Sequence, residues 1–247
     1  MNEYLLREIL GLNFNTERNN FSTLLEQFME NYANCGWHPE VLSTGVFGNV
    51  NLHRPVVTIS LNPKFDKGAD YINNYTLLQQ SNLNGFAGSY FYEDDKKLHN
   101  VWKNLAKVLF SEGERLNNSL KQLLQDNVVN IDYFPVYSEK FPTLNDEILN
   151  SQLFTYLNDH MNRLIQNINP RLIFLSGKSL APWFSSFCEE NENNSMELQH
   201  GPKSYKVRSG TLTNTDIPVV YQEWFINSGN RNVNLERVRS LIVDLSE

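Results

Sequence analysis

The sequence predicts an α/β protein of three layers (α/β/α), in which helices cover both faces of a central, mainly parallel four-stranded sheet. Four short runs rich in β-branched and other apolar residues are typical of buried strands in a parallel sheet. Segments with apolar residues at helical spacing alternate with these runs, which is the pattern of a sheet covered by helices. The expected strands span residues 55–61, 128–133, 170–176 and 218–225. The expected helices span 18–34, 98–110 and 233–245, and a further long helix is expected within 143–168.

Composition restricts the class of protein. We interpret the 247 residues as a single domain, 1–247, with an N-terminal helical extension over about residues 1–54. No apolar run approaches the roughly 20 residues of a membrane span, and the N-terminus has no export-signal pattern. The two cysteines and five histidines are scattered along the sequence, without the spacing that is typical of metal ligands. We therefore expect a cytoplasmic monomer with reduced thiols, no metal and no cofactor, and the net charge of −7 argues against a general basic coat for nucleic acid.

The first expected strand ends on a polar residue, Asn62, which precedes Pro63. A proline has no N–H for the strand ladder and disfavours helical geometry in the residue before it. The strand therefore ends with Asn62 at its carboxyl edge, where open α/β sheets bind ligands. Asn62 either presents its carboxamide to a ligand or a water there, or only caps the turn.

The other expected strands end in polar residues as well. Asn130 lies near the end of the second strand, and its buried amide is expected to be tied to the backbone or aimed at a ligand. Gly177, Lys178 and Ser179 follow the third strand and open a helix, which offers N–H groups, a lysine and a hydroxyl to a phosphate without the glycine spacing of a P-loop. Residues 227–231 follow the fourth strand. All four ends are expected to share one edge of the sheet.

The remaining segments are interpreted from their composition. Residues 42–52 indicate a loop or a weak edge strand, and the polar residues 189–216 indicate an excursion from the sheet. The long aromatic connection 64–97 either contacts a ligand or packs against the body of the protein. His160 lies on the apolar stripe of its helix and is interpreted as structural. Basic residues expected in loops near the carboxyl edge, where they would form a local positive field, are Lys64, Lys67, Lys178, Lys203, Lys206, Arg208 and Arg231.

Taken in order, these strand ends resemble motifs of the uracil-DNA glycosylase superfamily, most closely its mismatch-specific branch. Leu61-Asn62-Pro63 resembles G-I-N-P-G, and residues 99–103 resemble N-R-F-W-K. Val129-Asn130-Ile131 is similar to the strand whose asparagine reads the base. Residues 170–181 resemble the stretch that holds the phosphate-contacting turn, and residues 227–231 resemble N-P-S-G-L. The resemblance covers about residues 55–240.

This resemblance implies a DNA glycosylase that flips a uracil-like or modified pyrimidine out of DNA and hydrolyses its N-glycosidic bond, leaving an abasic site. Asn62 would position the attacking water and Asn227 would support the leaving base. The site residues that the resemblance implies are catalytic Asn62 and Asn227, base-binding Leu61, Lys64, Phe91 and Asn130, and DNA-binding Lys178, Ser179, Ser228, Gly229, Asn230 and Arg231.

Three positions depart from the family pattern and leave the substrate open. Lys64 replaces a glycine or tyrosine, Ser228 replaces a proline, and Arg231 replaces the leucine that wedges into the duplex. Lys64 either points to solvent or a phosphate, or hydrogen-bonds a polar C5 substituent of the base. The candidate bases are uracil, mismatched thymine and a C5-substituted cytosine of phage DNA, with a role in repair or in antiviral defence. The alternatives are a DNA- or nucleotide-binding module without catalysis, and a nucleoside or nucleotide N-glycosidase.

Overall fold

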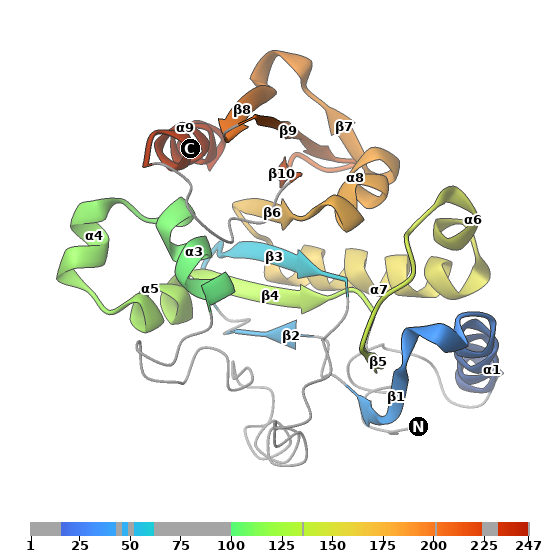
Figure 1. Ribbon diagram of the computed structural model, residues 1–247. Helices are drawn as coiled ribbons and strands as arrows, with labels where there is room; N and C mark the ends of the chain where they lie inside the picture. Colours follow the sequence, from blue (N-terminus) through green and yellow to red (C-terminus); the bar gives the residue numbers. More distant parts are fainter. Residues whose placement is uncertain are drawn as a thin grey trace.

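A sheet forms the middle layer of the molecule, and helices lie on both of its faces (Figure 1). The predicted α/β class is therefore confirmed, with helices placed as a three-layer arrangement requires. The computed structural model describes residues 16–42, 46–48, 52–61, 100–134, 136–200, 202–223 and 232–246.

The four predicted strands form the centre of the sheet. They are β3 (Val56–Ser60), β4 (Val128–Asp132), β6 (Leu172–Ser176) and β10 (Pro218–Gln222), each within a few residues of its expected bounds. They stand in the order β4-β3-β6-β10, and each neighbouring pair is parallel. Nearly all of their residues are buried, because helices cover both faces. The four carboxyl ends consequently lie at one edge of the sheet, as predicted.

The predicted number of strands is wrong, because antiparallel strands extend this centre on both sides. Within the described residues the sheet has eight strands. The additional strands are β2 (Val46–Phe47), which pairs with β4, β9 (Lys203–Leu212), which pairs with β10, and β7 (Cys188–Glu190) and β8 (Met196–His200), which both pair with β9. The edge strand that we considered for residues 42–52 is confirmed by β2.

The interpretation of residues 189–216 as an excursion is also wrong, since they form β8, β9, the end of β7 and the short 3₁₀ helix η5 (Glu192–Asn194). Leu198 and Val207 are buried on one face of β8 and the first half of β9, whereas the other face of this part is exposed at Glu197, Gln199, Ser204 and Lys206. A strand with only one covered face contains many polar residues. The polar composition of this segment therefore concealed its strands.

A small antiparallel sheet joins β1 (Trp37–Leu42) to β5 (Val136–Ser138), after the 3₁₀ helix η2 (Ala33–Cys35). Its residues surround an aromatic cluster: the ring centroids of Trp37 and Phe134 lie 5.5 Å apart, and those of Phe28 and Phe134 lie 5.3 Å apart. These contacts attach the small sheet to the N-terminal helix, as the lower right of Figure 1 shows.

One helical layer packs against the face of the sheet that includes Val57 and Ile59. It consists of α1 (Thr16–Asn31), α6 (Asp146–Leu149), α7 (Gln152–Ile168) and α8 (Ala181–Phe187). Phe21 and Leu25 of α1 are buried in the same core, so the N-terminal helix is part of it. The long helix expected within residues 143–168 is confirmed as α7, which begins where the Ser151 hydroxyl caps it.

The other helical layer packs against the face that includes Val56 and Phe174. It consists of α3 (Asn100–Leu109), α5 (Leu120–Asn127) and α9 (Asn232–Ser246), and α4 (Glu112–Asn117), which has no buried residue, connects α3 to α5. Helices α3 and α9 were predicted, whereas α4 and α5 were not. A capping box marks the start of α4: Ser111 N–H donates to Glu114 Oε2 at 2.7 Å, and Glu114 N–H donates to Ser111 Oγ at 3.3 Å.

His160 is buried in α7, as we expected of a structural residue. Desolvation, with a smaller contribution from Arg163, lowers the pKa of His160 to about 4. The side chain is therefore neutral near neutral pH, and it does not line the pocket described below.

Replacing Gly210 in β9 by alanine should destabilise the edge of the sheet. A Cβ atom there would lie 2.3 Å from the carbonyl oxygen of Glu189 in β7, which is too close for atoms that are not bonded. We expect G210A to lower the free energy of unfolding by about 1–3 kcal/mol in urea denaturation.

The matched control is G113A in α4, where a Cβ would meet no atom within 4 Å. That variant should leave stability unchanged or raise it by up to about 1 kcal/mol. Equal stability of the two variants would contradict the pairing of β7 with β9.

Candidate functional site

The face of the sheet that packs against α3 and α9 changes from apolar to polar toward its carboxyl edge. Paired residues of parallel strands point to the same face, so the register aligns them in rows across the sheet. From the amino to the carboxyl edge the rows are Val56, Val128 and Leu172, then Thr58, Asn130 and Phe174, and then Asp132, Ser60, Ser176 and Gln222.

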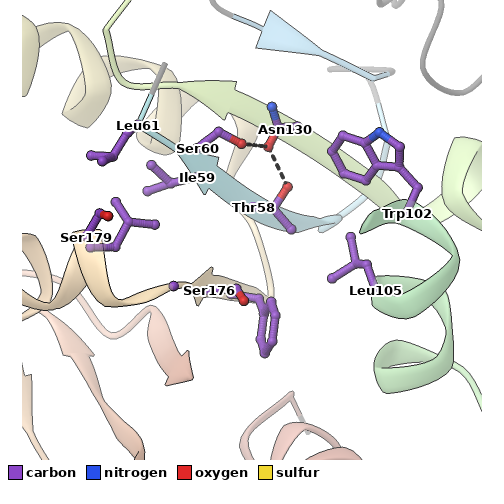
Figure 2. Close-up of a pocket in the computed structure, with 12 residues that line it drawn as sticks. Thr58, Ile59, Ser60, Leu61, Trp102, Leu105, Asn130, Ser176 and Ser179 are labelled. Atoms are coloured by element: carbon purple, nitrogen blue, oxygen red, sulfur yellow. Dashed lines mark hydrogen bonds between the residues drawn. The ribbon is translucent and has the colours of Figure 1, made fainter. Parts of the chain in front are cut away.

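A pocket of about 240 Å³ opens where this face becomes polar (Figure 2). Its walls come from the carboxyl ends of β3, β4 and β6, from α3, and from the 3₁₀ turn η4 (Lys178–Leu180) that precedes α8. Trp102 and Leu105 of α3 lie on one side of the pocket, and Leu61 and Ser179 lie on the other (Figure 2). This volume is below the roughly 300–1,000 Å³ of sites for drug-sized ligands. The pocket therefore suits a small group such as a single flat ring.

The polar wall of the pocket is organised by Asn130, of which only 3% is exposed. Asn130 Oδ1 accepts hydrogen bonds from Thr58 Oγ1 at 2.9 Å and from Ser60 Oγ at 3.0 Å, both drawn in Figure 2. Asn130 Nδ2 donates to Asp132 Oδ1 at 3.4 Å. The amide is therefore held by other side chains and not by the backbone, one of the two alternatives that we expected, whereas its contact with a ligand stays a prediction.

Gly177 makes the turn that brings η4 to the pocket. Its φ of +111° lies in a region that residues with a Cβ rarely adopt, and its N–H donates to the carbonyl oxygen of Gln222 at 2.9 Å. The predicted opening of a helix after the third strand is confirmed, with η4 leading into α8. Lys178 Nζ lies 3.7 Å from Glu223 Oε1, and its side chain is 74% exposed, so this ion pair contributes little to stability.

The pocket brings together three of the predicted site residues. Leu61, Asn130 and Ser179 line it, although they are far apart in the sequence, and Lys178 is adjacent to Ser179. The other predicted site residues lie outside the described residues: Asn62, Lys64, Phe91, Asn227, Ser228, Gly229, Asn230 and Arg231.

Two residues of the pocket, Thr58 and Ser60, were not predicted. Alternate residues of a strand face the same side, so two polar residues in the otherwise apolar run of β3 indicate a shared polar face. Trp102, which lies in the stretch 99–103 that resembles N-R-F-W-K, also lines the pocket.

Arg208 does not contribute to a local positive field in the way that we expected. Like Lys203 and Lys206, it lies in β9 rather than in a loop, and its Nε donates to Glu190 Oε1 at 2.8 Å. Its guanidinium also lies 4.6 Å from the centroid of the Phe184 ring. Hydrogen bonding to Glu190 raises the pKa of Arg208, and hydrogen bonding to Arg208 lowers the pKa of Glu190. Arg208 therefore holds β7, α8 and β9 together.

A second depression, of about 300 Å³, lies at the opposite edge of the sheet, between the amino end of β3, Arg171 and the end of α5. Open α/β sheets bind ligands at the carboxyl edge rather than the amino edge. The pocket at Asn130 is therefore the stronger candidate.

Comparison with models of known protein families, with characterised proteins and with solved structures finds no match for this chain. Among the described helices, none is long and apolar enough to cross a membrane. The part of the chain that the structure describes also contains no group of three or more His, Cys, Asp or Glu side chains that could hold a metal ion. The chemistry of the pocket is thus the basis for assigning a function.

Asn130→Ala should destabilise the protein by about 1–3 kcal/mol, because the hydroxyls of Thr58 and Ser60 lose their buried acceptor. Thr58→Val should be less costly alone. The double variant should lose about 0.5 kcal/mol or more less unfolding free energy than the sum of the losses in the two single variants, since both substitutions remove the same hydrogen bond. Urea denaturation of the four proteins measures this coupling.

The control is Thr23→Val, because among the described residues the Thr23 hydroxyl bonds only to a backbone carbonyl of its own helix. Its effect should add to that of Asn130→Ala. Additive costs for Thr58→Val and Asn130→Ala would contradict the hydrogen bond between these residues.

Proposed function

We propose that the chain is a monofunctional DNA N-glycosylase of the uracil-DNA glycosylase type, which binds an extruded pyrimidine nucleotide and hydrolyses its N-glycosidic bond. The main support is the convergence of Leu61, Asn130 and Ser179 on one small pocket at the carboxyl edge of the sheet. These residues belong to three of the segments whose order resembles the glycosylase motifs. A sheet of this kind binds ligands at that edge.

The extruded base occupies the pocket in this proposal. Extrusion costs roughly a few kcal/mol, which contacts inside the pocket must offset. The apolar side chains of Leu61 and Trp102 lie on opposite sides of the pocket, and Asn130 with its two hydroxyl partners offers a polar wall for the edge of the ring. Phe91 is proposed to stack on the base from the connection that follows β3.

The reaction breaks the bond between C1′ and the base and forms a bond from C1′ to the oxygen of water. As the first bond stretches, the sugar gains oxocarbenium character and the base gains negative charge, so hydrogen-bond donors that face the base lower the barrier. Asn62 holds the water. An amide does not take up a proton near pH 7, so the water proton passes to solvent or to the departing base. Asn227 supports that base.

The DNA backbone is proposed to lie along the carboxyl edge. Lys178 and Ser179 contact phosphates on one side, and residues 228–231 contact them on the other, with Arg231 filling the gap that the base leaves. Lys178 is well exposed at this edge. Because the whole chain carries a net charge of −7, binding depends on this local positive charge and should weaken steeply as salt rises.

The direct test is incubation with a panel of DNAs that contain uracil, mismatched thymine or C5-substituted cytosine, followed by an assay for alkali-labile abasic sites. An abasic product from at least one DNA supports the proposal. DNA binding without product would favour a binding module, and turnover of free nucleosides or nucleotides alone would favour a nucleoside N-glycosidase.

Asn62→Ala is expected to abolish excision on the DNA that the wild-type protein cleaves, and to leave DNA affinity within about threefold, since phosphate contacts supply most of that affinity. Single-turnover excision and equilibrium binding measure the two effects. Asn118→Ala, at the exposed end of α4, is the matched control and should retain full activity. Full activity of Asn62→Ala would contradict the role assigned to Asn62.

A further inference from the structure

Thr58 and Ser60 form one wall of the pocket, called here the β3 wall. Their hydrogen bonds to Asn130 decide whether this wall donates hydrogen bonds to a ligand or accepts them. A hydroxyl group has one proton to donate. Thr58 and Ser60 each donate theirs to Asn130 Oδ1, at 2.9 and 3.0 Å. The two hydroxyl oxygens then have only lone pairs to offer a ligand, so the β3 wall accepts hydrogen bonds from a ligand and does not donate them.

Asp132 holds the amide in the orientation that produces this polarity. In the observed orientation Asn130 Nδ2 faces Asp132 Oδ1 at 3.4 Å. The reverse orientation would place the amide oxygen against that carboxyl oxygen, and it would leave two acceptors facing each other. Because Asn130 is 3% exposed and Asp132 is 7% exposed, little water is available to separate them.

We propose that the pocket selects a base with an exocyclic amino group, cytosine or a C5-substituted cytosine, over uracil and thymine. This inference rests on the proposed function for the entry of a pyrimidine into the pocket. The 4-amino group of cytosine has two hydrogens, one for each hydroxyl oxygen of the β3 wall. Beside the β3 wall, Ser176 of the neighbouring strand β6 also lines the pocket, and its hydroxyl can donate to the O2 carbonyl, which all pyrimidines share.

Uracil and thymine fit the same wall poorly. Their O4 carbonyl would meet lone pairs where cytosine presents hydrogens, and a site built to hydrogen-bond an N–H group discriminates strongly against an analogue that lacks it. A substituent at C5 leaves the 4-amino group in place. The same wall therefore accepts modified and unmodified cytosine, and other contacts of the site must distinguish between them.

Base preference is measured as equilibrium binding, separately from cleavage. The probes are DNA duplexes with one 2′-fluoroarabino-cytidine or 2′-fluoroarabino-uridine, because the fluorine suppresses the oxocarbenium ion and blocks excision. Each target base lies opposite an abasic spacer, so no base pair has to be broken. We expect the wild-type protein to bind the cytosine duplex at least about tenfold more tightly than the uracil duplex.

Variants of the wall test its polarity. Thr58→Val and Ser60→Ala should each bring the cytosine-to-uracil binding ratio close to one, because each removes an acceptor and frees a lone pair of Asn130 Oδ1 for the N3–H of uracil. Thr58→Ser keeps the hydroxyl and should keep the preference. Thermal unfolding of each variant shows whether it is folded.

Four results test the proposed base preference separately from the proposed glycosylase function. A cytosine preference that Thr58→Val and Ser60→Ala reduce supports the polarity of the wall, even if no DNA yields an abasic product, in which case the glycosylase function is overturned. An abasic product together with equal binding or a uracil preference overturns the polarity alone. A cytosine preference that folded Thr58→Val and Ser60→Ala retain also overturns it. Absence of binding to both duplexes overturns both.

Discussion

A buried amide must satisfy its own hydrogen-bonding groups, and Asn130 does so through hydroxyls on the neighbouring strand. Leaving such a group without a partner costs about 1–3 kcal/mol. The pairing depends on the parallel register of β3 and β4, in which Thr58 lies opposite Asn130. A shift of one residue would turn Thr58 and Ser60 to the other face of the sheet. The register and the polarity of the pocket are therefore linked.

The same register explains where the pocket lies. At the amino edge, Val56 and its neighbours in β4 and β6 are covered by the apolar side chains of α3, α5 and α9. At the carboxyl edge the corresponding positions are polar, and there Trp102 and Leu105 of α3 form one side of an opening instead of sealing the sheet. One face of one sheet thus supplies both a hydrophobic core and a binding site.

The sequence was sufficient to predict the four central strands, because their apolar runs are typical of buried parallel strands. It also predicted that Leu61, Asn130 and Ser179 meet, because the carboxyl ends of parallel strands lie at one edge of the sheet. It did not reveal the antiparallel strands, since one face of β8 and of the first half of β9 is polar, and this polar composition was interpreted as an excursion. The alternation of Met196 and Leu198 with Glu197 and Gln199 was a signal for β8. The partners of Asn130 could not be predicted, because they depend on which strand lies beside β4.

The central claim is that an extruded base binds beside Asn130, between Leu61 and Trp102. The most direct measurement is a crystal structure of the protein with a duplex that contains a 2′-fluoroarabino-cytidine. We expect the base to lie in the pocket at the ends of β3, β4 and β6, with its amino group within hydrogen-bond distance of the Thr58 and Ser60 hydroxyls. A base that lies elsewhere on the protein, or that stays stacked in the duplex while the pocket is empty, would contradict the account.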